Sequence, residues 1–259
     1  GTFSDGKLNT LVKDTFGRGK EVLSRFVEAG APSEILYQQK PHLGTDQLVG
    51  IVQFMRHQIE EMGGEFRFRS TVTDLMIRDR KLNAVIVNAK EEIPAEICIL
   101  APVYLTFDDG PIPEVTPWVL ELLEKHNINM EPKSFAVGVR VEHPQTMINQ
   151  DLYGEPENDR LGASSYKVTH TLENGRGVYS FCMCPGGYVV NASSEEGMLA
   201  VNGMSYQARD SHNANSAIIV TVNPSDFPEE GVLGGIALQR KLERAAWEAG
   251  NGSIPVQLF

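Results

Sequence analysis

Two adjacent carboxylates, Asp108 and Asp109, lie between an apolar run and a Gly-Pro turn in the stretch VYLTFDDGPIPEVTPW. Paired carboxylates at the end of a strand can hold a metal and a base together, and a metal-bound water then becomes the nucleophile. The pair therefore indicates metal-assisted hydrolysis. A second interpretation is a solvated turn between a strand and a helix, where Asp and Gly are common.

A catalytic metal such as zinc usually needs three protein ligands, so one carboxylate is not enough. Two histidines four residues apart would put both imidazoles on one helical face, and no pair in this chain has that spacing. We therefore favour the turn interpretation. Ligands that converge from distant positions, for example His143 or His170, are the alternative. The histidines are His42, His57, His126, His143, His170 and His212.

Cys182 and Cys184 form a Cys-x-Cys pair that is followed by Pro-Gly-Gly. Side chains two residues apart on a strand point to the same side, so we expect both thiols on one face beside a tight turn. They are candidate catalytic residues, and the alternative is two small core residues. With Cys98, the odd count of three cysteines favours a reduced, cytoplasmic setting over a disulfide framework.

The charge of the chain limits its partners. The formal net charge is -11, and such a surface repels phosphate backbones and anionic lipids. No apolar run approaches the ~20 residues that span a bilayer. We expect no nucleic-acid partner and no membrane partner, and instead a small-molecule substrate. Arg140, His143 and Arg209 are candidates for binding an anionic substrate, although surface charge is the favoured explanation for each.

Apolar spacing predicts the elements that position these residues. We expect helices over about residues 17–29, 45–62, 117–125 and 233–249, with Thr45 or Asp46 capping the second. Three strand-like runs, EFRFRS, VTDLMIRD and LNAVIVNA, come before residue 90. AEICILA then fits a strand buried on both faces, as in a parallel sheet. The strands expected after residue 130 are FAVGVRVEHP, SYKVTHTL, GVYSFCMCP, GYVVNAS and SAIIVTV.

The string TFDDGP resembles the first motif of the polysaccharide deacetylases, over about residues 103–128. The resemblance implies that Asp108 is a general base and that Asp109 binds the metal. That family supplies two more ligands from a later H-x-x-x-H motif, which this sequence lacks. The deacetylase function is therefore the disfavoured alternative.

Longer stretches resemble a family of FAD-dependent dehydrogenases that is related to the two-dinucleotide-fold flavoproteins. They cover nearly all of residues 1–100 and 130–259, and they are long and in order, which makes this the more specific resemblance. The matching stretches are GTFSDGKLNT, EILYQQKPHLGTDQLVGIV, GGEFRFRSTVTDL, MEPKSFAVGVRVEHPQ, GRGVYSFCMCPGGYVVNASSEEGMLAVNGMSY and ARDSHNANSAIIVTV.

This second resemblance implies several site residues. The backbone near Val72 would meet the adenine, and Cys182 and Cys184 would lie in the domain that covers the flavin. The sequence has no G-x-G-x-x-G fingerprint after a strand, so we expect this chain to bind FAD weakly. The residues expected along the flavin are Gly1, Thr2, Ser4, Asp5, Gly6 and Lys7.

The sequence therefore predicts an α/β fold and an FAD-dependent oxidoreductase, or a fragment of one. Residues 1–101 would form an incomplete FAD-binding domain, and residues 102–129 an inserted deacetylase-like strand, turn and helix. Residues 130–222 would form a β-rich substrate or cap domain, and residues 223–259 a helical return segment.

Overall fold

A computed structural model describes residues 6–8, 13–99, 122–127, 129–158, 160–193 and 195–258. These residues form both helices and antiparallel sheets, which confirms the α/β class predicted from the sequence. Contacts divide the chain into two compact units. The first contains Gly1–Phe66, Val137–Val190 and Asn202–Val220, and the second contains Arg67–Ala136, Asn191–Val201 and Thr221–Phe259. The domain boundaries proposed from the sequence stay predictions.

In the first unit, α1 (Arg18–Glu28), η1 (Ser33–Leu36) and α2 (Thr45–Glu61) surround a small apolar core. The residues of this core are Ala31, Ile35, Leu43 and Ile51. The predicted capping of α2 is wrong, because its N-cap is Gly44 and no side chain caps it. Thr45 and Asp46 instead bond to a distant segment: Thr45 Oγ1 donates to the Ser205 carbonyl and Asp46 accepts from the Gln207 N–H.

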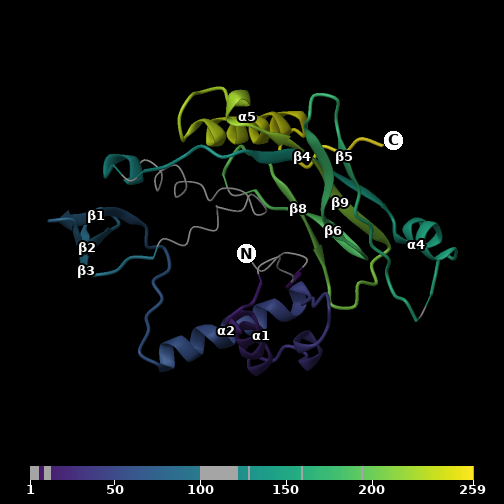
Figure 1. The fold of residues 1–259 in the computed structure, drawn as a ribbon, viewed down its shortest axis with the longest axis horizontal. Helices are drawn as coiled ribbons and strands as arrows, with labels where there is room; N and C mark the ends of the chain where they lie inside the picture. The colour runs from purple at the N-terminus through teal and green to yellow at the C-terminus, as the bar shows by residue number, and fades with distance from the viewer. Residues whose placement is uncertain are drawn as a thin grey trace. The chain divides into compact units, whose positions relative to one another are not determined.

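The strands of the first unit form two sheets (Figure 1). A four-stranded sheet has the order β4 (Phe135–Pro144), β9 (Asn213–Val222), β6 (Gly177–Cys184) and β5 (Thr169–Thr171). A second sheet pairs β7 (Gly187–Asn191) with β8 (Val201–Ser205). β4 begins and ends where the sequence predicted. The outermost one or two residues of β4, β7, β8 and β9 belong to the second unit.

A buried polar network anchors α4 (Gln145–Tyr153), which follows β4 directly. Gln145 is 6% exposed and its Nε2 donates to Asn149 Oδ1 at 2.9 Å and to the Ser164 carbonyl at 3.0 Å. Its Oε1 accepts the Gly186 N–H at 2.8 Å. Asn149 Oδ1 also accepts from the N–H and the hydroxyl of Ser164. Each amide therefore has several partners, as burial of polar groups requires.

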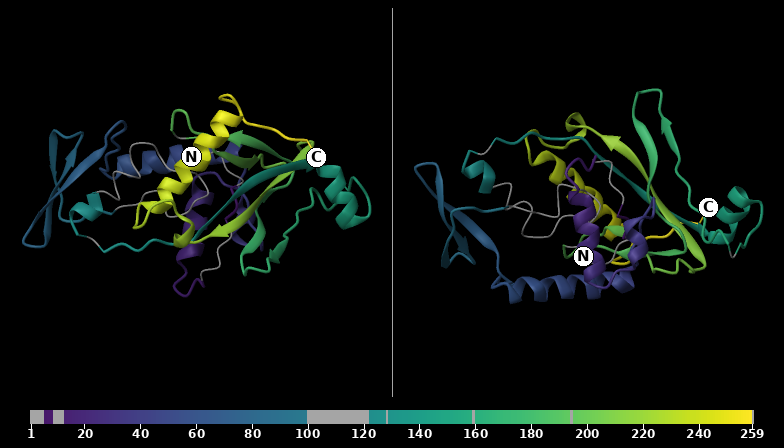
Figure 2. Two further views of the ribbon diagram at one scale, coloured as in Figure 1. Left: turned by 90° about the horizontal axis from the view of Figure 1, so that it is seen from above. Right: turned by 60° about the horizontal axis from the view of Figure 1, so that its bottom comes forward.

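The second unit contains an antiparallel sheet with the order β1 (Val72–Arg78), β2 (Lys81–Val87) and β3 (Glu91–Pro94), visible in Figure 2. Residues 122–125 are helical. After β9, η3 (Pro224–Asp226) leads to α5 (Gly234–Ala249), and the rings of Phe135 and Phe227 lie 5.5 Å apart. The described strands of this sheet pair antiparallel, so they do not form the buried parallel sheet that the run AEICILA suggested.

Two predicted strands do not form among the described residues. Residues 65–70, the run EFRFRS, and residues 95–99, from the run AEICILA, contain no strand. Phe68 is 71% exposed, and Ile97 and Ile99 are 81% and 84% exposed. A strand needs a neighbour to satisfy its N–H and C=O groups, and the alternation in sequence cannot supply one. Residues 100–121 and 128 lie outside the described residues, so the inserted segment at 102–129 stays a prediction.

The Gln145 network yields a matched pair of substitutions. Gln145→Leu is expected to lower the free energy of unfolding by roughly 2–4 kcal/mol, because it leaves the buried Gly186 N–H and Ser164 carbonyl short of partners. Gln150→Leu on the same helix removes an exposed bond to the Gly154 carbonyl and should change stability by less than about 0.5 kcal/mol. Urea denaturation followed by circular dichroism measures both. Equal stability of the two variants would contradict the role given to the network.

Candidate functional site

The N-terminal segment predicted to lie along a flavin is described only in part. Gly1, Thr2, Ser4 and Asp5 lie outside the described residues, whereas Gly6 and Lys7 lie beside residues 41–43. Lys7 and His42 form an antiparallel bridge, and the Leu43 N–H donates to the Gly6 carbonyl at 2.9 Å. The Leu8 N–H donates to the Pro41 carbonyl at 3.0 Å. This short backbone pairing fixes the position of the Lys7 backbone, from which its side chain extends.

The Lys7 ammonium group donates a hydrogen bond to the carbonyl of Met183, in the middle of the Cys-x-Cys sequence of β6. The fold thus joins two segments that the sequence singled out separately for chemistry. They are 176 residues apart along the chain. Neither segment carries a signal that predicts the other as its neighbour.

A β-bulge separates the two cysteines of β6. Phe181 lies opposite Ala217 and Cys184 opposite Asn215, so β6 takes three steps while β9 takes two. The extra residue breaks the two-residue alternation that predicted both thiols on one face. Cys182 has a φ of 46° and is partly exposed, whereas Cys184 is 0% exposed. Cys184 Sγ lies 3.3 Å from the Cys182 carbonyl. The catalytic role of the two cysteines stays a prediction.

Arg140 of β4 binds groups from three other strands. Its Nη1 donates to Asn215 Oδ1 at 2.7 Å, and both Nη atoms donate to the Cys182 carbonyl at 3.1 and 3.2 Å. Nη2 also lies 3.5 Å from Asn202 Oδ1. No carboxylate of the described part of the chain pairs with this guanidinium. Arg140 is therefore a half-buried cation held by neutral oxygens, not the surface charge that we favoured from the sequence.

Gly203 of β8 allows this arrangement. A Cβ on Gly203 would lie 2.4 Å from Asn215 Oδ1 and 2.5 Å from Arg140 Nη1, so any larger residue would collide with the pair. Asn215 is 0% exposed, and its Nδ2 donor has no hydrogen-bond partner among the described residues. An unpaired buried donor costs on the order of 1–3 kcal/mol. Within the described part of the chain, the site thus combines a cation without a counter-ion and an amide N–H without an acceptor.

Two titratable side chains lie on the same unit. The rings of His143 and Tyr166 are 5.5 Å apart. Burial lowers the pKa of His143, against a smaller opposing effect of Glu142. Burial raises the pKa of Tyr166, while a hydrogen bond with Ser216 and the charge of Arg140 act in the opposite direction. At neutral pH, His143 is uncharged and Tyr166 keeps its proton.

The Pro-Gly-Gly turn after β6 is fixed from two sides. The Gly186 N–H donates to the buried Gln145 side chain, as described above. Gly186 has a φ of 49°, and a Cβ there would lie 1.8 Å from the Arg209 carbonyl. The turn therefore requires glycine. Sequence reasoning missed Gln145, Asn149 and Asn215, because isolated amides carry no motif. The four-residue spacing of Gln145 and Asn149 could have indicated that the two amides are neighbours on one helix face.

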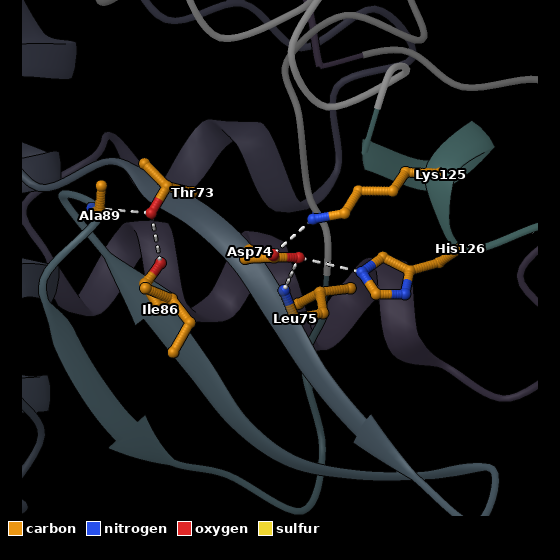
Figure 3. Close-up of polar contacts among 7 residues, drawn as sticks. All are labelled: Thr73, Asp74, Leu75, Ile86, Ala89, Lys125 and His126. Carbon is orange, nitrogen blue, oxygen red and sulfur yellow. Dashed lines mark hydrogen bonds and ion pairs between the residues drawn. The ribbon is translucent and has the colours of Figure 1, made fainter.

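Val72, expected to meet the adenine, begins β1 and pairs with Val87. Beside it, Asp74 receives three hydrogen bonds (Figure 3). Lys125 Nζ lies 2.6 Å away, His126 Nε2 lies 3.0 Å away, and the Leu75 N–H donates at 2.9 Å. These bonds, first Lys125 and then His126, lower the pKa of Asp74 to about 2. The contacts connect β1 to residues 125 and 126.

Comparison with known proteins finds two family models in this chain. Residues 134–259 match a family described as FAD-dependent protein, C-terminal domain-like. Residues 101–156 match the polysaccharide deacetylase family. Both resemblances predicted from the sequence are therefore confirmed at the level of the family models. Arg140, Cys182, Asn202 and Asn215 all fall within the FAD-dependent match.

An uncharacterized protein of Clostridium beijerinckii is 46% identical to this chain over 262 residues. The alignment covers 100% of this chain and 47% of that protein, so the chain spans about half the length of the curated relative it matches. The name of the relative assigns no activity.

No helix among the described residues has both the length and the apolar character needed to cross a membrane. The same residues contain no cluster of three or more His, Cys, Asp or Glu side chains arranged to hold a metal. Asp108 and Asp109 lie outside the residues described, so the structure does not test their proposed roles.

The Asp74 contacts predict a pH-dependent contribution to stability. The pKa of Asp74 falls from 3.8 to about 2 on folding, so its stabilising effect is complete above pH 3.8 and is lost as the pH falls through 2. Asp74 and Lys125 are 34% and 61% exposed, which limits the expected loss in Asp74→Asn to at most about 1 kcal/mol at pH 7.

Denaturant unfolding of wild type and Asp74→Asn at pH 7 and at pH 2 measures this contribution, and the difference should shrink at the lower pH. Glu92→Gln, on β3 of the same sheet, is the control and should change stability by less than about 0.5 kcal/mol. A constant difference for Asp74→Asn at both pH values would refute the assignment.

Proposed function

We propose that this chain belongs to an FAD-dependent oxidoreductase and supplies the part that lies against the flavin and the substrate. The match of residues 134–259 to the FAD-dependent family model carries the proposal. The contact between Lys7 and Met183 supports it, because it brings the segment expected along the flavin to the strand expected to cover it. The substrate would be a small molecule.

The hydrogen-bond donors of the site match the acceptors of a flavin ring, but not the pyrophosphate of FAD. An isoalloxazine ring offers carbonyl oxygens and ring nitrogens as acceptors, and protein groups near them tune its electronics. Lys7 and Arg140 supply positive charge, and Asn215 supplies an N–H that needs an acceptor. The sequence offers no glycine fingerprint for the pyrophosphate. The residues therefore fit the ring better than they fit the whole dinucleotide.

When bound, FAD would supply the hydride chemistry. The residues of this chain would bind the cofactor, orient it against the substrate and hold protons near it. Arg140 would stabilise negative charge near the ring through hydrogen bonds to charged groups, which are stronger than neutral ones. Tyr166 keeps its proton at neutral pH and can donate it in a hydrogen bond. Of the two thiols, Cys182 is the one open to a substrate, since Cys184 is 0% exposed.

Titration with FAD, followed by flavin fluorescence and confirmed by equilibrium dialysis, tests this proposal. We expect the chain to bind FAD with a Kd weaker than about 1 µM, because the pyrophosphate cradle is missing. Arg140→Gln should weaken binding about tenfold through loss of a charged hydrogen bond, or about 1.4 kcal/mol. Lys167→Gln removes a nearby exposed cation and serves as the control.

Three outcomes of the FAD titrations would contradict parts of the proposal. A sub-micromolar Kd for the wild-type chain would contradict the incomplete site. Equal affinity of wild type and Arg140→Gln, with both shown to be folded by circular dichroism, would remove Arg140 from the proposed site. A drop in affinity of the same size for Lys167→Gln would mean that general charge attraction, not the Arg140 geometry, drives binding.

The alternative function is a metal-dependent polysaccharide deacetylase, which the match of residues 101–156 supports. The chain has no histidine pair at helical spacing, so we expect no metal-dependent activity. The assay is acetate release from an acetylated chitooligosaccharide with excess zinc or cobalt. Wild type and Asp109→Ala should give the same trace release. Metal-dependent release that disappears in Asp109→Ala would establish the alternative.

A further inference from the structure

Helix α5 buries an acidic side chain that the proposed function does not use. The structure describes α5 throughout, and its buried residues are Gly234 and Glu243. Glu243 is 8% exposed, and its Oε1 accepts a hydrogen bond from Gln239 Nε2 at 2.8 Å. Within the described part of the chain, no Lys, Arg or His side chain forms an ion pair with this carboxyl group. An ionised carboxylate is costly to bury without a paired cation, so burial favours the neutral acid.

Residues 195–199, which we call the 195–199 segment, are attached to α5 at this position. The Leu199 N–H donates to the backbone carbonyl of Glu243 at 3.0 Å. Arg240 of α5 donates from Nη2 and Nε to Glu195 Oε1, at 2.8 and 3.2 Å. Leu199 is also buried, with 5% of its surface exposed. A main-chain hydrogen bond and an ion pair therefore hold the segment on the helix.

The surroundings of Glu243 favour its protonated form. Burial is the main cause that raises the pKa of Glu243 above its ordinary value of 4.5, and the negative charge of Glu195 acts in the same direction. The hydrogen bond from Gln239 and the charge of Arg240 act in the opposite direction. Glu195, on the segment, and Arg240, on α5, are the charged groups of the described chain that act on Glu243. Because Arg240 is already bound to Glu195, ionised Glu243 would leave two carboxylates with one guanidinium.

We propose that Glu243 is a proton-operated latch: protonated Glu243 keeps the 195–199 segment on α5, and ionised Glu243 releases it. Ionisation puts an unpaired negative charge into a buried contact, and local opening of the segment relieves this charge without unfolding the chain. The segment continues into β8, whose Asn202 is an acceptor of Arg140. Release therefore removes a restraint from the start of a strand of the candidate site. The latch itself does not depend on FAD binding.

The pH dependence of the latch is opposite in sign to that of Asp74. Below pH 4.5, Glu243 holds its proton in both the closed and the released forms, and the stabilising effect of the closed form is complete. As the pH rises, the released form loses its proton first, because the pKa is raised only in the closed form. The closed form therefore loses stability as the pH rises through the raised pKa, and the segment opens more often at neutral pH.

Hydrogen exchange of the Leu199 amide tests the latch in the 259-residue chain. Wild type is compared with Glu243→Gln, whose amide has the shape of the protonated carboxyl group but cannot ionise. At pH 4 the two proteins should exchange this amide at the same rate. At pH 7.5 wild type should exchange it at least about fivefold faster, the lower end of typical coupling between two linked equilibria. The ratio of the two rates at one pH cancels the intrinsic pH dependence of exchange.

A control variant and a second measurement accompany this comparison. Glu248→Gln changes an exposed carboxyl group of the same helix and should exchange the Leu199 amide like wild type at both pH values. A carbon-13 NMR titration of wild type gives the pH at which the Glu243 carboxyl group ionises. The rise in Leu199 exchange, divided by the rate of an unstructured peptide of the same sequence, should have its midpoint at that pH. This second measurement needs no variant, so it holds even where Glu243→Gln does not fold.

Three results would overturn the proposal. The first is equal exchange of the Leu199 amide in wild type and Glu243→Gln at pH 7.5. The second is a rise in exchange whose midpoint differs from the titration of Glu243. The third is a rise of equal size in the amides of β2, which would mean that the second unit as a whole loses stability and that the 195–199 segment has no opening of its own.

Discussion

One half-buried cation joins four strands of the first unit. The Arg140 guanidinium joins β4 to the Cys182 carbonyl of β6, to Asn202 of β8 and to Asn215 of β9. Moving a guanidinium away from water is costly unless its donors are used, so these neutral acceptors must keep their places. The Arg140 side chain thus links the sheet formed by β7 and β8 to the four-stranded sheet.

The backbone around Arg140 is shaped to suit it. The bulge in β6 turns the Cys182 carbonyl to a position where both Nη atoms reach it, and Gly203 leaves room for the guanidinium. Bulges commonly redirect groups next to functional sites. The Gln145 network fixes the turn that follows β6. A site held in this way is preorganised, which is what the proposed role in binding a flavin ring requires.

The secondary structure was largely readable from the sequence. Period-two alternation predicted β4 from Phe135 to Pro144 and the two long strands β6 and β9, and helical spacing predicted α2 and α5. The predictions that failed have causes in the tertiary structure. The run EFRFRS and residues 95–99 have strand-like sequences, but hydrogen bonds to a neighbour, and not the sequence pattern, decide whether a strand forms. The cap of α2 failed because Thr45 and Asp46 found partners in residues 205 and 207.

The sequence by itself determined the α/β class, most element positions and the resemblance to FAD-dependent proteins, because these depend on local periodicity and on long ordered motifs. Only the tertiary structure decided which polar residues meet. Lys7 reaches β6 across 176 positions, and Arg140 finds Asn215 on another strand. The bulge also separated the environments of Cys182 and Cys184. Long-range pairing depends on strand order and register, and one inserted residue changes the face of every side chain that follows.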